Sequence, residues 1–176
     1  MWYNTNLIGS DTMDISIGKL TITSFCLENI EHLKFRNDLQ KDELIYEFVS
    51  TSIEDDFYEV YSDNLELENS YIIKFQNTLV GYIYLTKLAE SEGLVELRYA
   101  VHPKYRRLGY GRKILEECRK YLFTLDNING IELHIRKDNE SSIYCAKRAK
   151  YKCIGENNNE YFYIYKSMKR DDNNEN

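Results

Sequence analysis

The chain of 176 residues lacks several features that would assign it to a specialised class of protein. It has no apolar run near the ~20 residues that a membrane-spanning helix needs, so no membrane association is expected. A single proline, Pro103, and the absence of repeats leave no sign of a linker between domains. The first residues also lack the basic and apolar segments of a secretory signal. These absences favour one soluble domain in the cytoplasm.

Metal sites, redox pairs and nucleic-acid binding are also not expected. The cysteines are scattered without a C-x-x-C pair, so reduced thiols are expected at Cys26, Cys118, Cys145 and Cys153. The three histidines add no metal-ligand spacing to them, and no metal is therefore expected. A nucleic-acid partner usually requires a basic face, and the net charge of −6 argues against one.

Acidic and basic residues are unevenly distributed along the chain. Residues 54–68 contain seven acidic side chains and no basic one, whereas residues 104–120 contain seven basic side chains and two acidic ones. Two solvated faces would explain this distribution. The functional alternative is a cationic acceptor on one side of the molecule and a polyphosphate donor on the other.

The periodicity of apolar residues predicts an α/β domain. Alternating patterns indicate strands at 19–25, 70–75, 79–85, 93–101, 131–136, 151–155 and 160–168. Amphipathic patterns indicate two short helices within 28–50 and one helix each at 109–123 and 139–149, with a further acidic helix or turn ending near residue 64. The order β-α-α-β-β-β-α-β-α-β-β predicts a mixed, mainly antiparallel sheet of six to seven strands flanked by helices. Residues 18–169 would form the domain, with an N-terminal extension at 1–17 and a polar tail at 170–176.

The most informative pattern lies in residues 101–112, between a predicted strand and a predicted helix. Free backbone N–H groups and the helix dipole favour an anion at such a helix start. Gly109 and Gly111 have no side chains, so a diphosphate can approach the amides closely. Positive charge comes from Arg106, Arg107, Arg112 and Lys113. The segment has neither the third glycine of a Rossmann fingerprint nor the Gly-Lys-Ser/Thr of a P-loop.

The segment resembles the diphosphate loop of the GNAT superfamily of N-acetyltransferases, which reads Arg or Gln, two residues, Gly, one residue, then Gly or Ala. Residues 96–101 match the family's strand that carries the acetyl-binding backbone, and residues 139–151 look like its helix that begins with Asn. The resemblance implies acetyl-CoA as the cosubstrate and a primary amine as the acceptor. It implies cofactor contacts from Tyr99, Ala100, Val101, Arg106, Arg107, Leu108, Gly109, Tyr110, Gly111, Arg112 and Asn139. Asn139 is also expected to cap its helix.

Glu96 is the candidate general base, because the attacking amine must lose a proton before it becomes a nucleophile. The alternative for Glu96 is a solvent-facing strand residue paired with Lys or Arg. Two other carboxylates, Glu92 and Glu59, are weaker candidates for the base. An amide near Val101 would form the oxyanion site.

The chain departs from the GNAT pattern at the helix of residues 139–149. The family often has a tyrosine seven residues after the Asn, and this tyrosine supplies a proton to the leaving thiolate; here the position is Ala146. Tyr144, about half a helical turn away, is the candidate for that role, and water is the alternative. The family's Gly-Phe pair is Lys150-Tyr151 in this chain.

Two functions from different classes follow from these observations. The first is an acetyl-CoA-dependent N-acetyltransferase acting on a protein N-terminus or lysine, a polyamine, an aminoglycoside-like drug or another small amine. The opening of the chain resembles the branch with Rim-type and spermidine acetyltransferases. The second is a non-catalytic acyl-CoA-binding regulator, which the missing tyrosine at position 146 favours. Homodimers are common among similar proteins, and the sequence leaves this question open.

Overall fold

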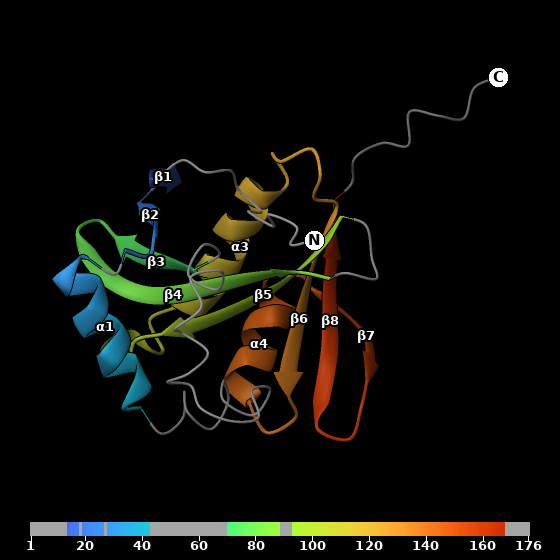
Figure 1. Ribbon diagram of the computed structural model, residues 1–176. Coiled ribbons are helices and arrows are strands. Elements are labelled where there is room, and N and C mark those ends of the chain that lie inside the picture. The colour runs from blue at the N-terminus through green and yellow to red at the C-terminus, as the bar shows by residue number, and fades with distance from the viewer. Residues whose placement is uncertain (1–13, 18, 27, 43–69, 89–92, 168–176) are drawn as a thin grey trace, which may run out of the picture.

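The computed structural model describes residues 14–17, 19–26, 28–42, 70–88 and 93–167. Within these ranges the chain forms an eight-stranded sheet in the order β1-β2-β3-β4-β5-β6-β8-β7 (Figure 1). All neighbouring strands are antiparallel except β5 and β6, which are parallel. The strands are β1 (Asp14–Ile17), β2 (Leu20–Ser24), β3 (Ser70–Phe75), β4 (Thr78–Lys87), β5 (Leu94–Val101), β6 (Gly130–Arg136), β7 (Lys152–Glu156) and β8 (Glu160–Lys166).

The predicted mixed, mainly antiparallel α/β fold is confirmed, with one strand more than the expected six to seven. The additional strand is β1, which pairs with β2 and lies in the segment assigned to an N-terminal extension. The four residues of β1 do alternate between polar and apolar, but four is the shortest run that indicates a strand. The described helices are α1 (Ile30–Gln40), the short 3-10 turn η3 (Pro103–Tyr105), α3 (Tyr110–Leu122) and α4 (Glu140–Arg148). The second and the acidic helix, predicted between residues 43 and 64, lie outside the described residues.

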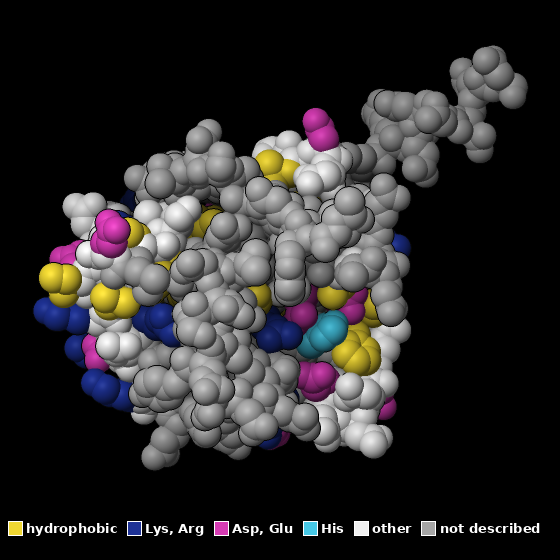
Figure 2. All heavy atoms as spheres, viewed as in Figure 1, with side chains coloured by type: hydrophobic (Ala, Val, Ile, Leu, Met, Phe, Trp, Pro, Cys, Tyr) yellow, Lys and Arg dark blue, Asp and Glu magenta, His cyan; other side chains and the backbone are white. Residues whose placement is uncertain are grey.

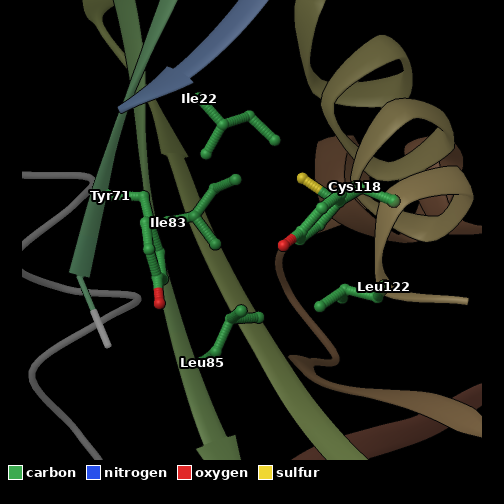
Figure 3. A pocket seen from close by; sticks show the side chains of 7 residues that line it. Ile22, Tyr71, Ile83, Leu85, Cys118 and Leu122 are labelled. Atoms are coloured by element: carbon green, nitrogen blue, oxygen red, sulfur yellow. The ribbon is translucent and has the colours of Figure 1, made fainter. Parts of the chain in front are cut away.

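Two hydrophobic layers cover opposite faces of the sheet. Adjacent residues of a strand point to opposite faces, and on β3 the buried Ile73 and Ile72 face different layers. Ile73 belongs to the larger layer, which packs against α3 and α4. Figure 3 shows part of this layer, where Ile83 and Leu85 of β4 face Cys118 and Leu122 of α3 around a void of about 10 Å³. Ile72 belongs to the smaller layer, which contains Phe35 and Leu39 of α1.

Local sequence explains where the helices begin and end. Asn29 caps α1, since its side-chain oxygen accepts from the backbone N–H groups of Glu31 (2.9 Å) and His32 (3.3 Å). Helix α4 ends in a Schellman motif: the N–H of Lys150 donates to the carbonyl of Lys147, and that of Tyr151 donates to the carbonyl of Ala146. Lys150 takes the left-handed conformation that this motif requires, with a φ of 68°. Lys150 and Tyr151 therefore form a turn in which a glycine at position 150 would adopt the required φ without strain.

Candidate active site

A cleft opens where β5 and β6 part. The two strands pair over only three positions, of which the last joins Glu96 to Glu132. Beyond this point β5 stays paired with β4 as far as Val101, while β6 follows β8 as far as Arg136. The space between the diverging strands is part of a cleft of about 930 Å³, lined by the second halves of both strands, the turn after β5, and α4. The strands that bear Val101 and Ile135 therefore diverge at this cleft.

The exposed edge of β5 presents backbone groups to this cleft. The N–H of His102 donates to the carbonyl of Val80 on the β4 side at 3.0 Å. Because antiparallel strands alternate the direction of their hydrogen-bonding groups, the N–H groups of Leu97, Tyr99 and Val101 point to the other side, toward the gap. The cleft therefore has a row of backbone groups that a flexible, amide-containing ligand can pair with as an added strand does.

The turn after β5 leads into an uncapped helix start. The N-cap of α3 is Gly109, with a φ of 83° and no side chain to accept a hydrogen bond. The first intrahelical bond runs from the N–H of Lys113 to the carbonyl of Gly109. The backbone N–H groups of Tyr110, Gly111 and Arg112 therefore precede the helical ladder, and no acidic residue occupies the first turn. A Cβ built on Gly109 would meet no atom within 4 Å, so there is open space beside this helix start, which favours an anion.

Gly111 has a second function in packing. A Cβ at this position would lie 3.1 Å from Sγ of Cys145 on α4 and 3.3 Å from Cε2 of Tyr99 on β5. The missing side chain lets the start of α3 approach β5 and α4 closely. Gly111 therefore helps to place the amides of the helix start at the mouth of the cleft.

The basic side chains near the turn differ in their availability to a ligand. Arg106 is engaged within the protein: Nε donates to the carbonyl of Val101 (3.2 Å) and Nη2 to Oδ1 of Asp42 (2.8 Å). Its backbone N–H donates to Pro103. Arg112 is exposed but pairs with Glu116 one turn along α3 at 2.8 Å. Arg107 is exposed and forms no ion pair with any residue that the structure describes, so it is the basic side chain of the turn best placed to meet an anion.

A buried polar cluster lies at the point where the strands part. Glu96 is 5% exposed and accepts two hydrogen bonds from Arg98, at 2.7 Å from Nε and 3.3 Å from Nη2. Burial lowers the pKa of the Arg98 guanidinium, but the hydrogen bond and charge of Glu96 outweigh burial and raise it overall. His134 of β6 lies beside this pair, with Nδ1 at 3.9 Å from Oε1 of Glu96 and Nε2 at 2.9 Å from Oε1 of Glu132. The alternative considered for Glu96, a solvent-facing residue paired with Lys or Arg, holds for the pairing but not for the position, which is buried.

This cluster faces away from α3 and α4. Its members alternate along β5 and β6 with Val95, Leu97, Leu133 and Ile135, which belong to the larger hydrophobic layer. Figure 2 shows acidic side chains gathered around a histidine on this face. Among the described residues, the cleft is therefore lined by backbone donors on the α3 side of the sheet and by ionisable side chains on the opposite side.

The comparisons with known proteins agree with this geometry. Residues 33–151 match a family model described as the acetyltransferase (GNAT) family. The chain belongs to the GNAT family. Three solved structures share its fold. The first is a GNAT-family acetyltransferase from Bacillus anthracis, with 18% identity and a TM-score of 0.72 over 88% of this chain and 98% of that one. The second is the spermidine N-acetyltransferase from Vibrio cholerae in complex with CoA and spermine, with 17% identity and a TM-score of 0.69 over 86% of this chain and 97% of that one. The third is RimL, a ribosomal L7/L12 α-N-protein acetyltransferase, with 15% identity and a TM-score of 0.70 over 90% of this chain and 97% of that one.

The GNAT helix that follows the cleft has unusual residues in this chain. Asn139 caps α4 as expected, because its side-chain oxygen accepts from the N–H of Ser142 at 3.1 Å. Ala146, at the family's tyrosine position, is completely buried in the larger hydrophobic layer. Tyr144 also lines the cleft but is 63% exposed at its rim, where the Arg148 guanidinium lies 6.0 Å from the centre of its ring. A proton donor on this face would therefore come from the rim.

Two further groups on this face stay neutral near pH 7. Burial, together with the neighbouring Cys145, raises the pKa of the Tyr99 hydroxyl, against a smaller opposite effect of a hydrogen bond with Ser142. Burial also raises the pKa of the Cys145 thiol, more than its hydrogen bonds with Tyr99 and the Arg112 backbone lower it. A neutral thiol is a poor nucleophile, so Cys145 is not a candidate for covalent catalysis.

His134 is the residue of the cluster that sequence reasoning missed. Nothing in its local sequence marks it, because Glu96 lies in a different strand. The available signal was the alternation of polar residues in 132–136, which matches that of 96–98 in a neighbouring strand.

Among the described residues no group of three His, Cys, Asp or Glu side chains is arranged to hold a metal ion. In the same ranges no helix has the length and hydropathy of a membrane span.

Proposed function

We propose that this GNAT protein transfers the acetyl group of acetyl-CoA to a primary amine. The parting of β5 and β6 beside an uncapped helix start is the observation that carries the proposal. A diphosphate suits the amides of Tyr110 and Gly111, since helix starts favour anions, whereas the Arg112 amide is bonded to the Cys145 thiol. The amides of a pantetheine arm suit the edge of β5. The solved spermidine N-acetyltransferase of similar fold contains CoA and spermine, which supports this assignment.

The remaining predicted cofactor residues have distinct tasks in this proposal. Tyr99 and Val101 offer backbone groups to the pantetheine arm, with Ala100 between them on the same strand. Arg107 and Leu108 form the exposed part of the diphosphate turn. Arg106 holds the turn in place through its bonds to Val101 and Asp42. Asn139 fixes the start of α4 at the cleft.

In the proposed reaction, the acceptor amine enters from the face that bears Glu96. Acetyl-CoA supplies an activated thioester whose carbonyl carbon accepts the amine. The carboxylate of Glu96 acts as the general base, directly or through a water molecule, because only a neutral amine attacks. The N–H of Val101 stabilises negative charge on the carbonyl oxygen, an effect typically of a few kcal/mol. Tyr144 or water protonates the leaving thiolate.

The acceptor is proposed as a primary amine of a polyamine, a protein N-terminus or lysine, or a small molecule. The solved structures of similar fold include an enzyme bound to spermine and an enzyme that acetylates a ribosomal protein. The face with Glu96, Glu132 and Glu160 suits a positively charged group, since these carboxylates outnumber the guanidiniums of Arg98 and Arg136, and Arg136 is paired with Asp138. The acidic segment of residues 54–68, which was also considered for a cationic acceptor, lies outside the described residues.

Calorimetric titration with acetyl-CoA tests the cofactor site. The wild-type protein should bind acetyl-CoA, and Gly109→Glu should abolish binding, because a carboxylate would stand where the diphosphate approaches. The matched control is Glu156→Gln on β7, outside the cleft. The Glu156 side chain is exposed, and its Oε2 lies 3.2 Å from Nζ of Lys137. Normal binding by the Gly109→Glu variant would disprove the placement of the diphosphate.

Release of free CoA thiol in the presence of spermidine, kanamycin or a peptide with a free N-terminus tests the transfer. Glu96→Gln should lower kcat/KM by about 10²–10⁴ while acetyl-CoA still binds. The second candidate function, a non-catalytic acyl-CoA-binding regulator, is favoured by the buried Ala146 at the family's tyrosine position. Binding of acetyl-CoA by the wild-type protein without release of thiol for any of these amines would support the regulator.

A further inference from the structure

We infer that His134 is a proton relay, which carries the proton taken from the acceptor amine away from Glu96 toward Glu132. The inference rests on the proposed acetyl transfer with Glu96 as the base. It assigns a function to the one imidazole that lies between two carboxylates at the point where β5 and β6 part, among the residues that the structure describes.

The surroundings of Glu96 explain why a relay is needed. The carboxylate is 5% exposed, and both of its oxygens accept hydrogen bonds from Arg98. A carboxyl group that has taken a proton loses its attraction to the guanidinium, and the buried arginine is left without its counter-charge. Protonated Glu96 is therefore a short-lived state, and its proton must leave before the next turnover.

His134 provides the exit on geometric grounds. Its Nδ1 lies 3.9 Å from Oε1 of Glu96, a separation that a small movement of the ring or one water molecule spans. Its Nε2 lies 2.9 Å from Oε1 of Glu132. Side-chain exposure is 6% for Glu96, 28% for His134 and 15% for Glu132, so both groups beyond the buried base are more open to solvent than the base is. An imidazole can accept a proton on one nitrogen and release it from the other.

The groups that face His134 support this use of the ring. On β5 these are Glu96 and Arg98, and on β6 Glu132 and Arg136, whose guanidinium is paired with Asp138 at 3.0 Å. On β8 the ring of Phe162 packs edge-on against the imidazole with centres 4.8 Å apart, and Glu160 lines the same cleft. The phenyl ring restrains the orientation of the imidazole, and the two carboxylates stabilise it while it carries the proton.

The protons of the reaction balance along this path. The ammonium R–NH3+ gives one proton to Glu96, and this proton passes to His134 and then to Glu132 or solvent. The free amine forms a C–N bond to the acetyl carbon, and the C–S bond breaks. The second proton of the nitrogen goes to the thiolate, which leaves as the free thiol. The products are the amide, CoA and one proton released to solvent.

Rescue of a defective variant by a soluble base tests the relay. The amine from the panel of spermidine, kanamycin and N-terminal peptide that gives the fastest thiol release serves as acceptor, in weakly buffered solution. His134→Gln keeps a hydrogen-bonding amide but cannot carry a proton, and its kcat should fall by about tenfold or more. Added imidazole should restore kcat in His134→Ala, which leaves space for it, but should not alter the wild-type protein. The dependence of kcat on pH should also change in His134→Gln, because this variant has no imidazole to carry the proton.

Control measurements separate a relay from a structural role. Affinity for acetyl-CoA and the thermal unfolding midpoint should be unchanged in both His134 variants, and Glu156→Gln should match the wild-type protein in every measurement. Glu132→Gln, which removes the carboxylate at the far end of the path, should also lower kcat, but by less than His134→Gln does. A wild-type kcat and pH profile in His134→Gln, or a loss that imidazole leaves unchanged, would overturn the relay. A wild-type protein that acetylates none of the amines would overturn the proposed function itself.

Discussion

Arg106 and Asp42, which are 64 positions apart in the sequence, form an ion pair in which Nη2 lies 2.8 Å from Oδ1. Asp42 follows the end of α1, and Arg106 begins the diphosphate turn. A second contact lies nearby, where the rings of Phe35 on α1 and His102 stack with centres 5.3 Å apart. Helix α1, on the face of the sheet that bears Glu96, thus supports the turn that leads into α3. This ion pair therefore connects the end of α1, on one face of the sheet, to the turn that leads into α3, on the other face.

The Arg106–Asp42 pair should contribute to acetyl-CoA affinity without contacting the ligand. Arg106→Gln and Asp42→Asn should each weaken binding several-fold, because the turn loses a contact that holds it in place. The double variant should be little worse than either single one, with a coupling energy of about 0.5–2 kcal/mol by calorimetry. Lys41→Gln is the control, since its contact with Asp38 is 3.8 Å long and both side chains are mostly exposed. Additive losses would show that the two residues act separately.

Lys150→Gly should stabilise the fold. Lys150 has a φ of 68° in the Schellman motif that ends α4, and this conformation costs a non-glycine residue roughly 1–2 kcal/mol. The greater freedom of glycine in the unfolded chain offsets part of the relief, so we expect a gain of about 0.5–1 kcal/mol in the free energy of unfolding in urea. Lys152→Gly on the exposed β7 has no such strain to relieve and should bring no gain. Equal effects of the two substitutions would contradict the explanation.

Tyr151→Phe should stabilise the protein and flatten the alkaline limb of its stability profile. The hydroxyl is buried and has no hydrogen-bond partner among the described residues, so its removal should add about 1 kcal/mol. Burial raises the pKa of Tyr151 above the ordinary value of a tyrosine. The folded state then holds this proton more tightly than the unfolded state, and stability is full below about pH 10 and falls as the pH rises further.

Urea unfolding at about pH 8 and about pH 10.5 measures both effects. The wild-type protein should lose more stability between the two pH values than Tyr151→Phe. Tyr161→Phe is the control, because its ring is only partly buried at the side of Lys137. The same loss in the wild-type protein and Tyr151→Phe would mean that other groups dominate the alkaline limb; buried Cys118 and Tyr71, whose pKa values are also raised, would then be examined.

The sequence by itself determined the features that depend on neighbouring residues. Apart from β1 and the short turn η3, strand and helix patterns predicted the described elements to within a few residues, since periodicity reflects which side of an element is buried. The uncapped start of α3 was also predictable, because Gly109 and the first amides of the helix are adjacent in the chain. The capping role of Asn139 follows from the same local geometry.

Only the tertiary structure decided which distant side chains meet. Arg106 was expected to add charge for a phosphate but is bonded to Asp42, and Gly111 is required for contact with Cys145 as well as for access to the amides. His134 entered the site because the parallel register places Glu132 beside Glu96 before the strands diverge. A register between strands depends on the packing of the whole sheet, and a single sequence carries no local signal for it.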